Sequence, residues 1–96
     1  MSVTILVELK IKTEAADLYA VRLRSAFPET RAYEGCQQIV AYRDSEQPER
    51  FVIVERWLSR AHYDRYIQWR RSTGTFDKLA AISDAPMSVR FLDVAA

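Results

Sequence analysis

The chain has 96 residues, enough for one domain over residues 1–96. Its 14 Lys and Arg residues nearly balance 13 Asp and Glu residues, which gives a net charge of +1. This charge gives no electrostatic reason to expect nucleic acid or an anionic membrane as a partner. One cysteine excludes an internal disulfide framework, and one histidine without a glycine-rich phosphate loop leads us to expect no metal and no bound cofactor. No apolar stretch could span a bilayer and the N-terminus lacks the apolar core of a signal peptide, so we expect no membrane association and a cytoplasmic location.

The first half of the chain predicts a strand, a helix and a second strand. Apolar and polar residues alternate from Val3 to Lys12, which is the period of a strand with one buried face. Thr13 is expected to cap a helix with apolar residues at helical spacing, and Pro28 is expected to end it. A second strand is expected from Thr30 to Arg43, where Gly35 indicates a bulge, a kink or a close backbone approach.

The second half predicts two more strands around a further helical region. Phe51 to Leu58 is an apolar strand without strict alternation, so both of its faces should be covered. One helical layer covers one face, and a second copy of the sheet is the economical cover for the other. Ser59 then opens a helix, Thr75 caps a short one, and a last strand runs over residues 87–94. This βαββαβ order predicts an α+β, ferredoxin-like fold with an antiparallel sheet.

Three parts of the chain form a recognisable pattern: the segment from Arg31 to Gly35 and Cys36, the strand from Phe51 to Trp57, and Tyr63, Tyr66, Trp69 and Arg70 on the helix that Ser59 opens. Together they resemble the antibiotic biosynthesis monooxygenase family of dimeric α+β barrels. The resemblance implies a homodimer in which two sheets pack into a barrel, with a pocket between sheet and helices in each subunit. It also implies oxidation of quinols or anthrones by molecular oxygen without metal or flavin, although other relatives degrade haem or isomerise small metabolites.

The chain departs from the family pattern at Tyr66. Many members carry a histidine at this position, nine residues after the tryptophan that ends the strand, whereas the only histidine here is His62, one turn earlier. Relatives that degrade haem have a catalytic tryptophan at this position and a histidine ten residues later, where this chain has Phe76. We therefore do not expect haem degradation.

Oxygenation without a cofactor needs a base for the substrate proton, a dry site and donors for the developing oxyanion. His62 is the candidate base, and Tyr66 is a candidate donor because a tyrosine with a pKa of about 10 is a poor base. The alternatives are a surface histidine and a core tyrosine. Since His62, Tyr66 and Arg70 lie four residues apart, we expect them on one side of the helix, where they would line one cavity with Trp57.

The other candidate residues would bind the substrate. Arg70 is expected either to hold an enolate or carboxylate or to cover apolar surface with its stem. Glu55 shares a strand face with Trp57, and if it is buried it is either a pocket acid or part of a salt bridge in the dimer. Tyr63, Trp69 and Trp57 are either pocket walls or plain core.

The sequence thus favours a cofactor-independent monooxygenase that oxidises a small aromatic, quinol or polyketide-like metabolite, with a second copy of the chain as partner. Two alternatives on the same scaffold stay open. One is a non-catalytic protein that binds a small molecule, and the other is an isomerase or lyase that uses the pocket without oxygen.

Overall fold

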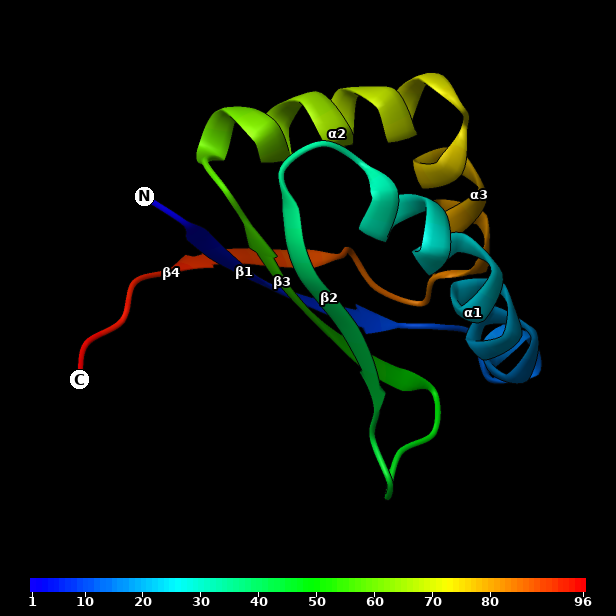
Figure 1. Cartoon of the computed structure of the whole chain (residues 1–96). Coiled ribbons are helices and arrows are strands. Elements are labelled where there is room, and N and C mark those ends of the chain that lie inside the picture. Colours follow the sequence, from blue (N-terminus) through cyan, green and yellow to red (C-terminus); the bar gives the residue numbers. More distant parts are fainter.

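The computed structural model describes all residues from 1 to 96, and it places a four-stranded antiparallel sheet beneath helices that lie on one of its faces (Figure 1). The strand order is β2-β3-β1-β4, which is the ferredoxin-like α+β arrangement that the sequence predicts. None of the helices is long and apolar enough to cross a membrane. The elements in chain order are β1 (Val3–Lys10), the short 3₁₀ helix η1 (Thr13–Ala15), α1 (Ala16–Ala32), β2 (Cys36–Arg43), β3 (Arg50–Trp57), α2 (Arg60–Ser72), α3 (Thr75–Ile82) and β4 (Ser88–Leu92).

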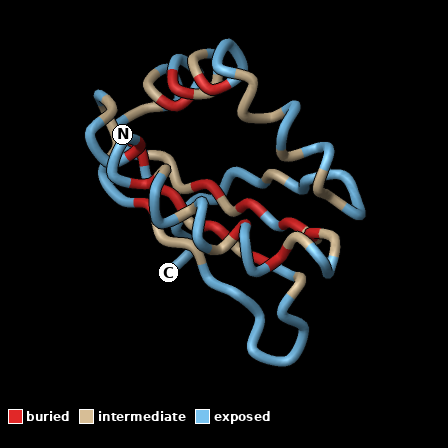
Figure 2. The backbone as a smooth tube through the Cα atoms, turned by 90° about the vertical axis from the view of Figure 1, so that its right-hand side faces the viewer, coloured by how far each residue is buried: buried red, intermediate tan, exposed pale blue.

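The core lies between the sheet and the helices. Side chains alternate across a strand, so Ile5, Val7 and Leu9 of β1 all point to the helical side, where they are buried. Phe51 and Ile53 of β3 pair with β1 on the same face and are buried as well. Buried residues accordingly line the strands and the inner sides of the helices in Figure 2. This layer of apolar side chains is also where the cavity described below is found.

The opposite face of the sheet is not covered by any element of the chain. Leu6, Val52 and Val54 point to this face and are only partly buried, and Tyr42 is 59% exposed there. The apolar run at the start of β3 is therefore buried on one side by this chain's helices. Its second side presents apolar surface to solvent.

Helix α1 continues past Pro28, which the sequence predicts to be its end, and stops at Ala32. The proline ring removes the hydrogen-bond partner of the carbonyl of Arg24, but both residues are exposed, so water can satisfy that carbonyl. The last turn of the helix is held by Thr30, which is completely buried and hydrogen-bonded to α2. As a result β2 begins at Cys36 and not at Thr30.

Gly35 lies in the turn before β2 and not within the strand. Its φ is 90°, and a Cβ at this position would lie 2.5 Å from side-chain atoms of His62, so the expected close approach is one between this turn and α2. A bulge does occur, in the first residues of β2. Neither Thr13 nor Thr75 is a helix cap, because each is the first residue of its helix, η1 and α3, and no side-chain hydrogen bond caps either helix. Ser59, by contrast, caps α2 as predicted.

Candidate functional site

A cavity of about 220 Å³ lies between the sheet and the three helices. Of the 22 residues that line it, 16 are hydrophobic, including Ile53 of the sheet, Phe27 of α1, Ile67 of α2 and Leu79 of α3. Its volume is smaller than the roughly 300–1,000 Å³ of pockets for drug-sized ligands. The cavity therefore suits a molecule of one or two rings with few polar groups.

Glu55 is the only carboxylate among the residues that line the cavity. The residue is 6% exposed, and its Oε1 accepts a hydrogen bond of 3.0 Å from the indole N–H of Trp57. Its other carboxyl oxygen has no partner in the protein, and since no fully buried side-chain polar atom lacks a partner, this oxygen must open onto the cavity. Burial raises the pKa of Glu55, and the bond from Trp57 opposes that rise. Such a carboxylate accepts a proton more readily than an exposed one.

Tyr66 and Arg70 contribute a second polar group to the wall. The Tyr66 hydroxyl accepts a hydrogen bond of 2.9 Å from Nε of Arg70 and lies 2.8 Å from the Thr30 hydroxyl. Arg70 also donates to Thr30 at 2.7 Å and to Glu29 at 2.9 Å. Burial raises the pKa of Tyr66 although Thr30 and Arg70 act in the other direction. Tyr66 is therefore a neutral hydroxyl at physiological pH, held in place by a cation.

Tyr19 and Tyr63 also line the cavity, and their hydroxyls make no hydrogen bond within the protein. Burial raises the pKa of each above its ordinary value, and the nearby Glu55 carboxylate adds to this rise. Both hydroxyls therefore stay protonated and are free to bond to a ligand. Together with Glu55, they add polar side chains to a mostly apolar wall, which is the usual composition of a small-molecule site.

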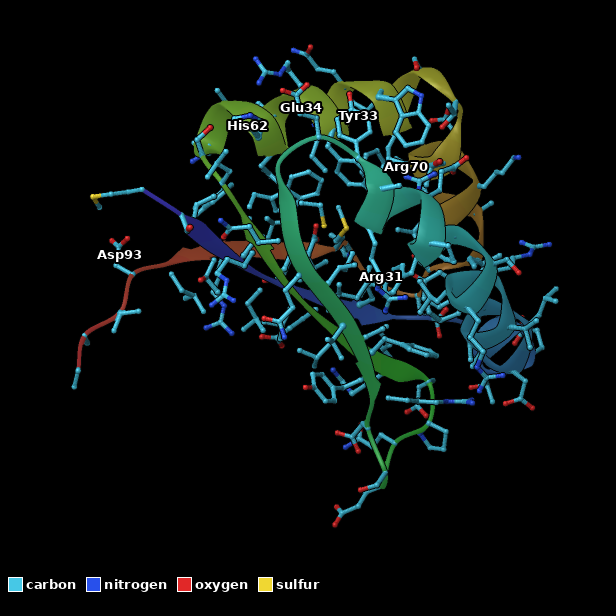
Figure 3. The ribbon with its side chains drawn as sticks, viewed as in Figure 1. Arg31, Tyr33, Glu34, His62, Arg70 and Asp93 are labelled. Carbon is cyan, nitrogen blue, oxygen red and sulfur yellow. The ribbon has the colours of Figure 1, made fainter.

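His62 lies outside the cavity, near the end of α2 opposite to Arg70 (Figure 3). Its Nδ1 is 2.7 Å from the hydroxyl of Ser59, and its ring packs over Gly35. Its Nε2 is 3.9 Å from a carboxyl oxygen of Glu34, an exposed residue in the turn after α1. The contacts of His62 thus tie the start of α2 to this turn.

The structure brings Tyr66 and Arg70 together in one cavity, but the expectation that His62 joins them is wrong. An α-helix turns by about 100° per residue, so each step of four residues drifts by roughly 40°. Over the two steps from Arg70 to His62 the drift reaches roughly 80°, which directs the imidazole towards the turn before β2. The only histidine is therefore not placed to take a proton from a ligand in the cavity.

Neither tryptophan reaches the cavity. Trp57 is fully buried beneath three tyrosine rings, so it is not the pocket wall that the sequence suggests, and its contribution is the hydrogen bond that orients Glu55. Trp69 stacks on Tyr33 at a centroid distance of 5.2 Å and lies beside the guanidinium of Arg70. Trp69 therefore contacts the arginine but does not line the cavity.

The residues of the cavity wall that were not among the sequence candidates include Tyr19, Arg22, Thr30 and Lys78. The helical spacing of α1 places Tyr19 on its buried side, and that pattern could have identified it. Thr30 was assigned to a strand, so its contact with Tyr66 and Arg70 could not be foreseen. Arg22 and Lys78 are exposed residues at the edge of the cavity, and nothing in the local sequence distinguishes them from other surface cations.

No group of three or more His, Cys, Asp or Glu side chains converges in the structure. The polar atoms on the cavity wall are those of one carboxylate, three tyrosines, two threonines and three cations. This set can exchange a proton through Glu55, donate hydrogen bonds through the tyrosine hydroxyls, and stabilise negative charge near Arg70.

Comparisons with known proteins agree on the fold. A crystal structure described as an antibiotic biosynthesis monooxygenase superimposes with a TM-score of 0.88 at 24% identity, covering 100% of both chains. A conserved protein from Methanosarcina mazei Go1 superimposes with a TM-score of 0.85 at 21% identity, covering 96% of this chain and 91% of the other. Rv0793 from Mycobacterium tuberculosis superimposes with a TM-score of 0.84 at 20% identity, covering 100% of both chains.

These identities are low, so the structural likeness establishes the fold alone. No curated protein sequence matches the chain. The sequence profile of the family described as "Antibiotic biosynthesis monooxygenase" matches residues 2–74, a segment that includes Glu55, Tyr66 and Arg70. Since this match covers well over half of the 96 residues, the chain belongs to the antibiotic biosynthesis monooxygenase family.

Proposed function

We propose that the protein is a cofactor-independent monooxygenase that oxidises a small, electron-rich phenolic or quinol-like aromatic molecule with molecular oxygen. The observation that carries the proposal is the buried Glu55, which presents a free carboxyl oxygen to an apolar cavity beside neutral tyrosine hydroxyls. Membership of the family supports the oxygen chemistry. Glu55 takes the place that the sequence suggested for His62.

The reaction starts when the Glu55 carboxylate accepts the proton of the phenolic O–H. The resulting phenolate passes one electron to O₂, and the superoxide and phenoxyl radical combine at a ring carbon that carries hydrogen. The new peroxide takes back the proton from Glu55. Loss of the C–H proton with cleavage of the O–O bond then leaves a quinone and water. One oxygen atom of O₂ enters the product and the other enters water, so no separate reductant is needed.

The tyrosines and Arg70 would support this chemistry by stabilising negative charge on oxygen. The free hydroxyls of Tyr19 and Tyr63 would donate to the phenolate, and Arg70 would hold the Tyr66 hydroxyl in a fixed orientation. The apolar walls exclude water, which strengthens each of these interactions and protects a reactive anion from reprotonation by solvent.

We also propose that two copies pack through the open face of the sheet. Apolar side chains such as Leu6, Val52 and Val54 lie on this face, and exposed Tyr42 and Leu92 extend it across the sheet. Exposed apolar side chains gathered on one face of a small protein are typical of an interaction site, and the Glu8–Arg90 ion pair lies on the same face. A homodimer would bury it without altering the cavity on the opposite face.

The proposal is tested by measuring oxygen uptake with electron-rich aromatics of one or two rings, such as 1-naphthol and 1,4-dihydroxynaphthalene. Glu55→Gln keeps the shape of the side chain and removes the proton acceptor, so we expect the rate to fall about 100-fold or more. His62→Gln is the matched control and should retain the activity, because His62 lies outside the cavity. Equal activity of Glu55→Gln and the wild type would contradict the role of Glu55.

A non-catalytic binding protein is the second candidate, and it is favoured by the lack of a second proton acceptor beside Glu55 on the cavity wall. The only histidine is outside the cavity and burial raises the pKa of all three tyrosines on its wall, so Glu55 is the only group available to accept a proton. Tight binding of these aromatics without oxygen uptake would support this alternative.

A further inference from the structure

The edge of the cavity carries two cations that have no acidic partner. Arg22 of α1 and Lys78 of α3 both line the cavity and are both exposed, so the cavity wall reaches solvent at these two side chains. Neither takes part in an ion pair, although five other pairs form in the structure. Arg70 is the third cation on the wall, but Glu29 already offsets its charge.

The charges on the cavity wall are thus separated. The only carboxylate, Glu55, is buried on the sheet, and the two unpaired cations lie at the opening. An anionic group would be repelled by Glu55 and would lose its hydration among apolar side chains if it entered deeply. At the opening it would stay partly hydrated and would find two positive charges.

On the basis of the proposed function, we infer that the substrate is an aromatic acid whose phenolic end enters the cavity and whose carboxylate is held at the opening by Arg22 and Lys78. Lys78 lies outside the segment that matches the family profile, so this half of the anion site is supplied by a part of the chain beyond the family match. The charge pattern also fixes the orientation of the ligand. With the carboxylate outside, the hydroxyl on the far side of the ring is directed towards Glu55.

A pair of isosteric probes tests this inference. 6-Hydroxy-2-naphthoate and 6-hydroxy-2-naphthamide have the same shape, two rings and one hydroxyl, and differ in charge. Calorimetric titration should show the carboxylate binding more tightly. Two exposed charge pairs correspond to roughly a twofold to thirtyfold difference in Kd. Raising the salt from about 0.1 M to about 1 M shortens the screening length from about 10 Å to about 3 Å and should remove most of the preference.

The double variant Arg22→Gln/Lys78→Gln should bind both probes equally, with the affinity for the amide unchanged. The matched control is Arg24→Gln/Arg65→Gln, which removes one exposed positive charge from α1 and one from α2, neither of them on the cavity wall, and should keep the preference. Equal binding of both probes by the wild type, or a preference that survives in the first double variant, would overturn the inference and leave the proposed function standing. Failure of the wild type to bind either probe would contradict the cavity as the binding site, and with it both proposals.

Discussion

Three buried tyrosines line the same cavity, and they differ in whether the hydroxyl has a partner in the protein. Removal of the hydroxyl from Tyr66 leaves Nε of Arg70 without its acceptor in a buried position, while Thr30 keeps its bond to Arg70. A lost hydrogen bond to a charged group costs about 1.5–3 kcal/mol. We therefore expect Tyr66→Phe to lower the free energy of unfolding by about 1.5–3 kcal/mol.

Tyr19→Phe and Tyr63→Phe make the same chemical change where the hydroxyl has no partner, so we expect changes within about 0.5 kcal/mol. Urea unfolding of the three variants at one protein concentration gives the comparison directly. Equal losses for all three would show that the network of Tyr66, Thr30 and Arg70 does not contribute as its geometry indicates. A further variant, Thr30→Val, should have less effect in the Tyr66→Phe background than alone if these residues are coupled.

Three further predictions concern pH, the turn before β2 and assembly. Burial raises the pKa of Glu55, so the folded protein binds the carboxyl proton more tightly than the unfolded chain does. The free energy of unfolding should therefore fall as the pH rises above about 4.3. In urea titrations at several pH values, Glu55→Gln should make this fall with pH smaller. Both glycines have a positive φ, which costs alanine about 1–3 kcal/mol at either position, but only at Gly35 would the added Cβ meet His62. Gly35→Ala should therefore destabilise the protein more than Gly74→Ala, and equal losses would contradict the close contact. Val54→Glu should yield a monomer in light scattering, whereas a dimer that persists would exclude the open face as the interface.

The strands and the fold class were accessible from the sequence because their signals are local. Alternation from Val3 onwards and the apolar run at Phe51 both reflect burial against a helical layer, and the structure has that layer on the predicted face. The end of α1 was not accessible. Thr30 holds the helix beyond Pro28 through residues 36 and 40 positions later in the chain, and no local rule reports such contacts.

The candidate site was predictable to a similar extent. Helical spacing correctly placed Tyr66 and Arg70 on the inner side of α2, and strand alternation correctly put Glu55 on a buried face. The pattern failed at His62 because a spacing of four drifts around the helix, and the direction of the first turn depends on how closely α2 approaches Gly35. The opening of the cavity depends on which surface residues of α1 and α3 reach its wall, and only the tertiary structure provides this.

Oxygen labelling tests the central claim most directly. When a phenolic substrate is turned over under ¹⁸O₂, mass spectrometry should find one ¹⁸O atom in the quinone product. When the label is supplied only as H₂¹⁸O, the product should contain no ¹⁸O, provided that the reaction time is too short for the quinone oxygens to exchange with water. Glu55→Gln should lower the amount of labelled product about 100-fold or more, whereas His62→Gln should not. Product without the label, or labelled product formed equally by Glu55→Gln, would contradict the account of Glu55 as the proton acceptor in a direct reaction with oxygen.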